Sequence, residues 1–266
     1  MRGQLGAGAV VSTAISVAGW RARALSGRGA VAATGVGTAI AVGASWPGMV
    51  VLGTFFVSSS ALSRTQRHGG VAAKGSRRDE WQVLANGAVA AVSALAGGRV
   101  DRAFGLSLSA GALAAAAADT WATELGASSR TTPRLILSGR AVPRGTSGGV
   151  TSRGSLAALG GAATLGAIAG IVIGSTSGWQ RGVRIGPGIV VAGLAGSLVD
   201  SVLGELVQER RNCPACNVAT EARIHDCGTP TVHSGGVRGF DNDLVNLVCT
   251  MAGCLAIVPF AYGTCD

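Results

Sequence analysis

The chain has 266 residues, of which 48% are hydrophobic and only 13% charged, with 43 glycines and a formal net charge of +9. Because soluble domains usually contain about 25% charged residues, this composition argues against one large soluble domain and predicts a polytopic membrane protein. The positive charge does not indicate nucleic-acid binding, since no basic patch is interleaved with aromatic residues. We therefore expect a membrane as partner and no nucleic acid.

The N-terminal segment has one positive charge followed by a short apolar run, as in a secretory signal. It lacks a clear small-x-small cleavage site before Trp20 and Arg21, so we interpret it as a first membrane helix. Apolar residues begin almost at once, which also argues against a transit peptide.

Apolar stretches recur along the chain, and each one predicts a membrane-spanning helix. Several are shorter than the ~20 residues that span a bilayer, so we count eight helices, with seven or nine as the alternatives. Glycines at helical spacing, such as Gly166, Gly170 and Gly174, predict close helix packing. The stretches are 4–20, 30–46, 48–63, 82–97, 104–126, 154–175, 187–207 and 242–262. The sequence thus predicts an all-α bundle of about eight transmembrane helices, forming a single integral membrane domain over residues 1–266.

Positive charges are unequally shared between the two sides of this predicted bundle. With eight alternating helices, loops 21–29, 64–81, 127–153 and 208–241 fall on one side and hold seventeen Lys and Arg residues, against five on the other. The positive-inside rule places the richer side in the cytoplasm, or in the stroma or matrix of an organelle. The basic loop 127–153 and the Cys/His-rich loop 208–241 are both expected there.

Three predicted helix ends on the positive side carry acidic residues: Asp119 with Glu124, then Asp200, then Asp241. Ionisable groups within membrane helices are costly and usually mark a function. Aspartates from two helices suit Mg²⁺, which binds one or two carboxylates together with substrate phosphate oxygens. We predict that Asp119 and Asp200 bind Mg²⁺, and that Glu124, rotated by about 140° from Asp119, assists. In the alternative interpretation, each carboxylate neutralises an arginine at the interface.

Loop 127–153 has the residues that an anionic substrate requires. Arginine side chains bind phosphate through two hydrogen bonds, and consecutive amides in a glycine turn can form an anion nest. The Gly-x4-Gly-Lys-Ser/Thr motif of a P-loop is absent from the sequence. The predicted phosphate-binding residues of this loop are Arg134, Arg144, Gly145, Thr146, Gly148 and Gly149.

The start of the last predicted helix adds polar groups to the same side. Asn242 and Asn246 lie one helical turn apart and can contact a substrate entering from the loops, with Asp241 as a further acid. The alternative is that Asp241 or Asn242 caps the helix.

Loop 208–241 differs in kind, because it holds Cys213, Cys216, His225 and Cys227. The spacing Cys-x2-Cys followed by His-x-Cys suits a structural tetrahedral Zn²⁺ site, and a reducing compartment favours a metal over disulfides. Free or redox-active thiols remain the alternative.

The order and spacing of six motifs resemble those of the integral-membrane family that includes animal transmembrane protein nineteen and the plant phytyl-phosphate kinase of tocopherol synthesis. This resemblance implies a kinase that uses CTP or another NTP to convert a prenyl or phytyl monophosphate to the diphosphate, in an endomembrane or the chloroplast envelope. It also implies that Asn86, in the first motif, contacts the substrate. The motifs are WQVLANGAV (81–89), DTWATELG (119–126), PRLI (133–136), VPRGTSGGVT (142–151), GLAGSLVDSVLG (193–204) and DNDLVN (241–246).

Two other functions fit the same residues. Nucleotidyl transfer to give a CDP-linked lipid needs a similar arrangement of acids and Mg²⁺. A non-enzymatic carrier of anionic lipid would use the arginines for binding and the acids for gating.

Overall fold

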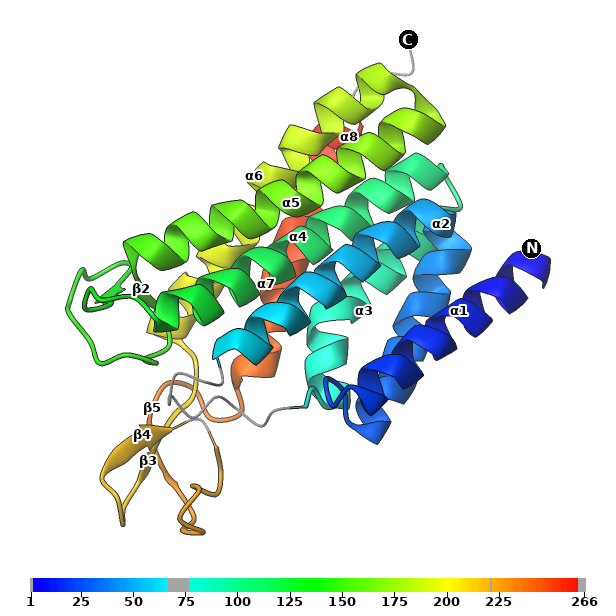
Figure 1. Ribbon diagram of the computed structural model, residues 1–266. Helices are drawn as coiled ribbons and strands as arrows, with labels where there is room; N and C mark the ends of the chain where they lie inside the picture. The colour runs from blue at the N-terminus through cyan, green and yellow to red at the C-terminus, as the bar shows by residue number, and fades with distance from the viewer. Residues whose placement is uncertain (1, 67–76, 221, 263–266) are drawn as a thin grey trace.

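The computed structural model describes residues 2–66, 77–220 and 222–262. Its helices are α1 (Arg2–Arg21), α2 (Gly27–Gln66), α3 (Glu80–Gly97), α4 (Arg102–Ala127), α5 (Ser152–Ser177), α6 (Trp179–Leu206), α7 (Asn242–Ala256) and α8 (Val258–Ala261). Its strands are β1 (Arg134–Leu135), β2 (Gly149–Val150), β3 (Arg210–Cys213), β4 (Val218–Thr220) and β5 (Val232–Gly235). The predicted membrane helix bundle is confirmed (Figure 1).

The described chain has seven helices longer than one turn, against the predicted eight, because stretches 30–46 and 48–63 are the two halves of α2, joined at a kink, and α8 is a single turn. Stretches 30–46 and 48–63 both lie in α2, which is interrupted at Ser45 with φ 58° and ψ −158°. Pro47 follows two residues later and lacks the N–H that a continuous helix needs. In the described chain, five helical segments are long and apolar enough to cross a membrane: 27–64, 102–127, 152–177, 179–206 and 242–261.

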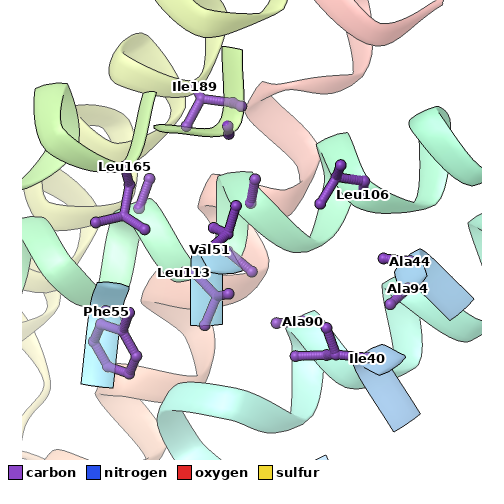
Figure 2. Close-up of a cluster of buried hydrophobic side chains, with 14 of the residues drawn as sticks. Ile40, Ala44, Val51, Phe55, Ala90, Ala94, Leu106, Leu113, Leu165 and Ile189 are labelled. Carbon is purple, nitrogen blue, oxygen red and sulfur yellow. The ribbon is translucent and has the colours of Figure 1, made fainter. Parts of the chain in front are cut away.

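Helix α4 lies at the centre of the bundle and packs against α2, α3, α5, α6 and α7. All of its residues from 109 to 118 are buried, which is expected for a helix that is small and apolar on every face. Figure 2 shows Leu113 of α4 beside Val51 of α2, and Leu165 of α5 and Ile189 of α6 belong to the same buried cluster. Alanine and glycine surfaces let these helices approach closely.

The contact between α5 and α6 shows this close packing directly. A Cβ atom on Gly182 would lie 2.3 Å from the carbonyl oxygen of Gly170, and one on Gly186 would lie 3.1 Å from that of Gly166. The predicted role of the glycines of α5 in helix packing is therefore confirmed.

The basic loops that connect the helices lie together at one end of the bundle. Figure 1 shows strands β1 to β5 and the starts of α3, α5 and α7 at this end, which we call the basic end. β1 and β2 form a small antiparallel pair, and β4, β3 and β5 form a three-stranded antiparallel sheet. Arg67 and Lys74, two of the charges counted on this side, lie outside the described residues.

Candidate functional site

Asp119 and Asp200 occupy the same level of the bundle on neighbouring helices. A Cβ atom on Gly196 of α6 would lie 2.4 Å from the Cβ of Ala115 of α4 and 2.8 Å from the carbonyl oxygen of Cys249 of α7. Asp119 and Asp200 each follow this three-helix contact by four residues, about one turn or 6 Å along the axis. Both are half-buried, and both lie close enough to Cys249 to interact with it electrostatically.

The two helices run in the same direction, so both carboxylates lie on the side of the contact that faces the basic end. Gly193 meets Ala114 just as Gly196 meets Ala115, so residues later in α6 meet residues later in α4. Asn246 of α7 precedes Cys249 by three residues in a helix of opposite direction, which brings it to the same level as the carboxylates. It is buried, with 9% of its surface exposed.

Glu124 lies on a different face of α4 from Asp119, in keeping with their expected angular separation. Its Oε1 accepts a hydrogen bond of 2.5 Å from the Ser63 hydroxyl of α2. It also lies within electrostatic range of Arg78. The structure thus brings Asp119 and Asp200 together and directs Glu124 toward α2.

The glycine turn of residues 145–149 packs directly on α6, one turn beyond Asp200. Gly148 has φ +77°, and a Cβ atom on it would lie 2.4 Å from the backbone nitrogen of Glu205 and 2.8 Å from the carbonyl oxygen of Ser201. Only glycine satisfies both this conformation and this approach. The turn is therefore next to the carboxylates in space, although some fifty residues separate it from Asp200 in the sequence.

The backbone amides of this turn are partly used within the loop. The Thr146 N–H donates to the carbonyl of Pro143 at 3.3 Å, and the Gly149 N–H donates to that of Thr146 at 3.0 Å. The Thr146 hydroxyl also donates to Pro143, at 2.7 Å. The predicted anion nest therefore lacks these two N–H donors.

The loop arginines that we predicted to bind phosphate lie at the surface. Arg134 Nη1 donates to the carbonyl of Gly139 at 2.8 Å and so supports the β1–β2 loop, while Arg144 is exposed next to the glycine turn. Glu205 fastens the same loop, because its carboxylate accepts the N–H groups of Leu137 and Ser138 at 2.7 and 3.1 Å.

Asp241 is the N-cap of α7. Its Oδ1 accepts the N–H groups of Asp243 and Leu244, both at 3.1 Å, so capping accounts for its position. Asn242 is the first residue of α7 and is half-buried. The catalytic role predicted for Asp241 stays a prediction.

Arg78 is a candidate site residue that the sequence analysis did not identify. Its backbone is paired with residues 24–26, with N–H···O distances of 2.9 and 3.0 Å. Its guanidinium lies 5.9 Å from the centre of the Phe55 ring. Desolvation by burial lowers the pKa of Arg78, and the charge of Glu124 offsets part of this effect. The sequence gives no signal for Arg78, because all the positive-side loops are rich in arginine. Only its burial distinguishes Arg78 from the neighbouring arginines.

Arg78 lines a cavity of about 90 Å³ between α1, α2 and α3. Most of the lining is apolar, including Ile15, Val36 and Phe55, and the polar side chains near Arg78 include Gln82 and Asn86. Asn86 Nδ2 donates to the carbonyl of Gln82 at 2.9 Å. Thr120, the residue after Asp119, lines the cavity as well, so the cavity reaches the helix that carries the acid pair.

The four predicted zinc ligands meet at one point beside the three-stranded sheet. The ligand atoms of Cys213, Cys216, His225 and Cys227 all lie within 4.8 Å of one another. Cys227 Sγ is 3.6 Å from Cys213 Sγ and 3.1 Å from His225 Nδ1. Hydrogen bonds with Thr229 and His225 lower the pKa of Cys227 to about 6, whereas the hydrogen bond with Cys227 raises that of Cys216 to about 11.

Comparison with known proteins places these residues in a family context. The sequence profile of the family described as integral membrane protein DUF92 matches residues 10–254. The chain is 38% identical to Protein PGR of Arabidopsis thaliana over 136 residues, which are 49% of this chain and 46% of the plant protein. It is 28% identical over 199 residues to an uncharacterized membrane protein of Methanocaldococcus jannaschii, covering 71% of this chain and 77% of the archaeal one. The match thus spans about half the length of the plant relative, and no solved structure matches the chain.

Proposed function

The chain belongs to the DUF92 family of integral membrane proteins, as its motifs predicted, and on that premise we propose that it is a membrane-bound phosphotransferase. The reaction is transfer of the γ-phosphoryl group of CTP, or another nucleoside triphosphate, to a prenyl monophosphate such as phytyl phosphate. An oxygen of the monophosphate attacks the γ-phosphorus and the bond to the β,γ-bridging oxygen breaks. The products are the prenyl diphosphate and the nucleoside diphosphate.

One observation carries this proposal: Asp119 and Asp200 lie at one level of neighbouring parallel helices, on the side of the basic end. Two half-buried carboxylates in a membrane bundle are costly unless a cation or a hydrogen-bond donor accompanies them. Asn246 adds a buried amide at the same level. The proposed active site is this group of three residues together with the glycine turn beside it.

These side chains fit a divalent cation such as Mg²⁺, because all three have the hard oxygen atoms that it prefers. Asp119 and Asp200 would hold the ion, with the Asn246 amide beside them. When bound, Mg²⁺ neutralises the charge of the nucleotide phosphates. The chain itself would position the phosphates with the glycine turn and Arg144.

The proposed acceptor site is the cavity beside Arg78. Its apolar walls suit the first part of an isoprenoid chain, and Arg78, Gln82 and Asn86 suit the phosphate at its head. A cavity of about 90 Å³ holds only part of a long tail, so the remainder would extend along the helices. Thr120 and Asp119 are adjacent in α4, which supports transfer between this cavity and the acid pair.

We place the active site on the cytoplasmic or stromal face of an endomembrane or the chloroplast envelope, because the basic loops surround it. The apolar cavity also suits a carrier of anionic lipid, the second candidate function. A carrier would move lipid phosphate without nucleotide, and nucleotidyl transfer would give a CDP-linked lipid.

The test is an assay of the purified protein in lipid nanodiscs with phytyl or geranylgeranyl phosphate, Mg²⁺ and labelled CTP or ATP. Asp119→Asn and Asp200→Asn should each lower kcat on the order of 100-fold, because they remove charge from the proposed metal-binding pair. Glu80→Gln is the matched control, since Glu80 lies at the same end and pairs with the exposed Arg28. Unchanged activity in either aspartate variant would refute the roles assigned to them. A CDP-lipid product, or nucleotide-independent transport, would favour the other functions.

A further inference from the structure

The segment of residues 208–241 has almost no hydrophobic core of its own. Val218, Ile224, Val232 and Val237 are all about half exposed or more. Cys213 is the only apolar side chain that is buried among the described residues of this segment. A unit this small that folds without a core usually depends on disulfides or a metal ion.

Two tight turns bring its cysteine and histidine residues together. The first turn follows β3, where the Asn217 N–H donates to the carbonyl of Cys213 at 2.8 Å and Asn217 has φ 54°. It presents Cys213 and Cys216. The second turn presents His225 and Cys227.

The second turn is closed in a similar way. The N–H of Gly228 donates to the carbonyl of His225 at 2.8 Å, and the His225 N–H donates to that of Thr229 at 3.0 Å. Gly228 has φ +81°, which favours glycine at this position. Each turn therefore holds two potential ligands in a fixed backbone conformation.

The distances suit a tetrahedral metal site. In a tetrahedral site with three sulfur ligands at ~2.3 Å and one nitrogen ligand at ~2.0 Å, neighbouring ligand atoms are ~3.5–3.8 Å apart. The two thiols of Cys213 and Cys227 are 3.6 Å apart, and all four ligand atoms lie within 4.8 Å of one another. Only small side-chain movements separate this arrangement from a bound ion.

We propose that Cys213, Cys216, His225 and Cys227 bind one structural Zn²⁺ ion, which holds the segment 208–241 in its folded form at the basic end of the bundle. Three thiols cannot all pair in disulfides within the cluster, whereas three thiolates and one imidazole complete a closed zinc site. The ion takes the place of the missing core, because its ligands come from both turns.

A cavity with several basic side chains is lined by residues close in sequence to two of the proposed ligands. Arg211 lies two residues before Cys213, and Arg223 lies two residues before His225. Both arginines line a cavity of about 460 Å³, together with His233, Arg238 and Glu209, the carboxylate partner of Arg211.

The test is the zinc content of the full-length protein, purified in detergent without added chelator. We expect close to one equivalent per chain by elemental analysis. His225→Cys should retain the metal, because a cysteine thiolate can replace the histidine as the fourth ligand. His225→Ala and Cys216→Ser each remove a ligand and should lose the metal. His233→Ala and Cys254→Ser are matched controls in and outside the segment and should retain one equivalent.

A second measurement covers variants that fail to fold. Cobalt exchanged into the unmodified protein should give the thiolate charge-transfer and d–d absorption bands of a tetrahedral site. After the metal is removed by a chelator, trypsin should cleave within residues 208–241 and leave the helices intact. Absence of zinc and of these cobalt bands in the unmodified protein, or zinc retained by both His225→Ala and Cys216→Ser, would overturn the proposal. None of these readouts depends on phosphotransfer activity.

Discussion

Gly196 of α6 packs directly on Ala115 of α4, and this contact aligns the two helices that carry the acid pair. A Cβ atom on Gly196 would lie 2.4 Å from that of Ala115, well inside van der Waals contact. The same Cβ atom would lie 2.8 Å from the carbonyl oxygen of Cys249 in α7. A single close approach of three helices therefore sets the distance between Asp119 and Asp200, one turn further on.

Replacing Gly196 with alanine should push α4 and α6 apart. Neither the Ala115 Cβ nor the Cys249 carbonyl can move away as a flexible side chain would, so we expect a destabilisation of about 1–3 kcal/mol. Phosphotransfer should fall as well, because the carboxylates separate. Gly35→Ala is the control, since a Cβ on Gly35 meets nothing within 4 Å. Thermal unfolding in detergent measures the difference, and equal melting temperatures for the two variants would contradict the packing argument.

A pair of alanine substitutions in the loop separates backbone strain from close approach. Gly148 and Gly139 both have positive φ, at +77° and +66°, but only Gly148 lies against α6. Both variants should lose about 1 kcal/mol from the unfavourable backbone conformation. Gly148→Ala should in addition lower kcat at least tenfold, because the turn must move away from Ser201 and Glu205. If Gly139→Ala impairs kcat to the same extent, contact with α6 is not the reason that residue 148 is glycine.

Glu205 should keep loop 127–153 in place. Its carboxylate accepts two backbone N–H groups, from Leu137 and Ser138. Glu205→Ala removes both acceptors, so we expect trypsin to cleave after Arg140 and Arg144 several times faster than in the unmodified protein. Glu80→Gln, at the same end of the bundle, should leave the cleavage rate unchanged. An unaltered rate in Glu205→Ala would show that other contacts hold the loop.

Arg78 should determine affinity for the lipid phosphate. Arg78→Ala removes the positive charge at the head of the apolar cavity, so KM for the prenyl phosphate should rise at least tenfold with a smaller change in kcat. The exposed neighbour Arg77 provides the control, and Arg77→Ala should leave KM within twofold. A loss of kcat at constant KM in Arg78→Ala would instead assign the guanidinium to the transition state.

Much of this architecture follows from local sequence. Apolar length identified the helices, because each span must bury its own backbone hydrogen bonds in lipid. The capping alternative for Asp241 was also visible, since an aspartate before an apolar run is a common N-cap. The Cys-x2-Cys and His-x-Cys spacings indicated a four-ligand cluster, and the structure brings those residues together.

The tertiary structure decided what depends on how helices rotate and cross. The boundary between the predicted stretches 30–46 and 48–63 coincides with the kink at Ser45 in α2, but the positive φ of Ser45 could not be read from the apolar pattern. Sequence placed Asp119 and Glu124 near one helix end, but only packing could direct one toward α6 and α7 and the other toward Ser63.

Arg78 and Gly148 show most clearly what the sequence could predict and what depended on the tertiary structure. Loop arginines are alike in sequence, and burial against Phe55 distinguishes Arg78 only once α2 and α3 are in place. The glycine turn was recognisable as a turn, yet its position on α6 comes from contacts between distant segments. Local composition determined which residue types this protein has at its basic end, and helix packing determined which of them meet, because proximity across helices is a property of the folded chain alone.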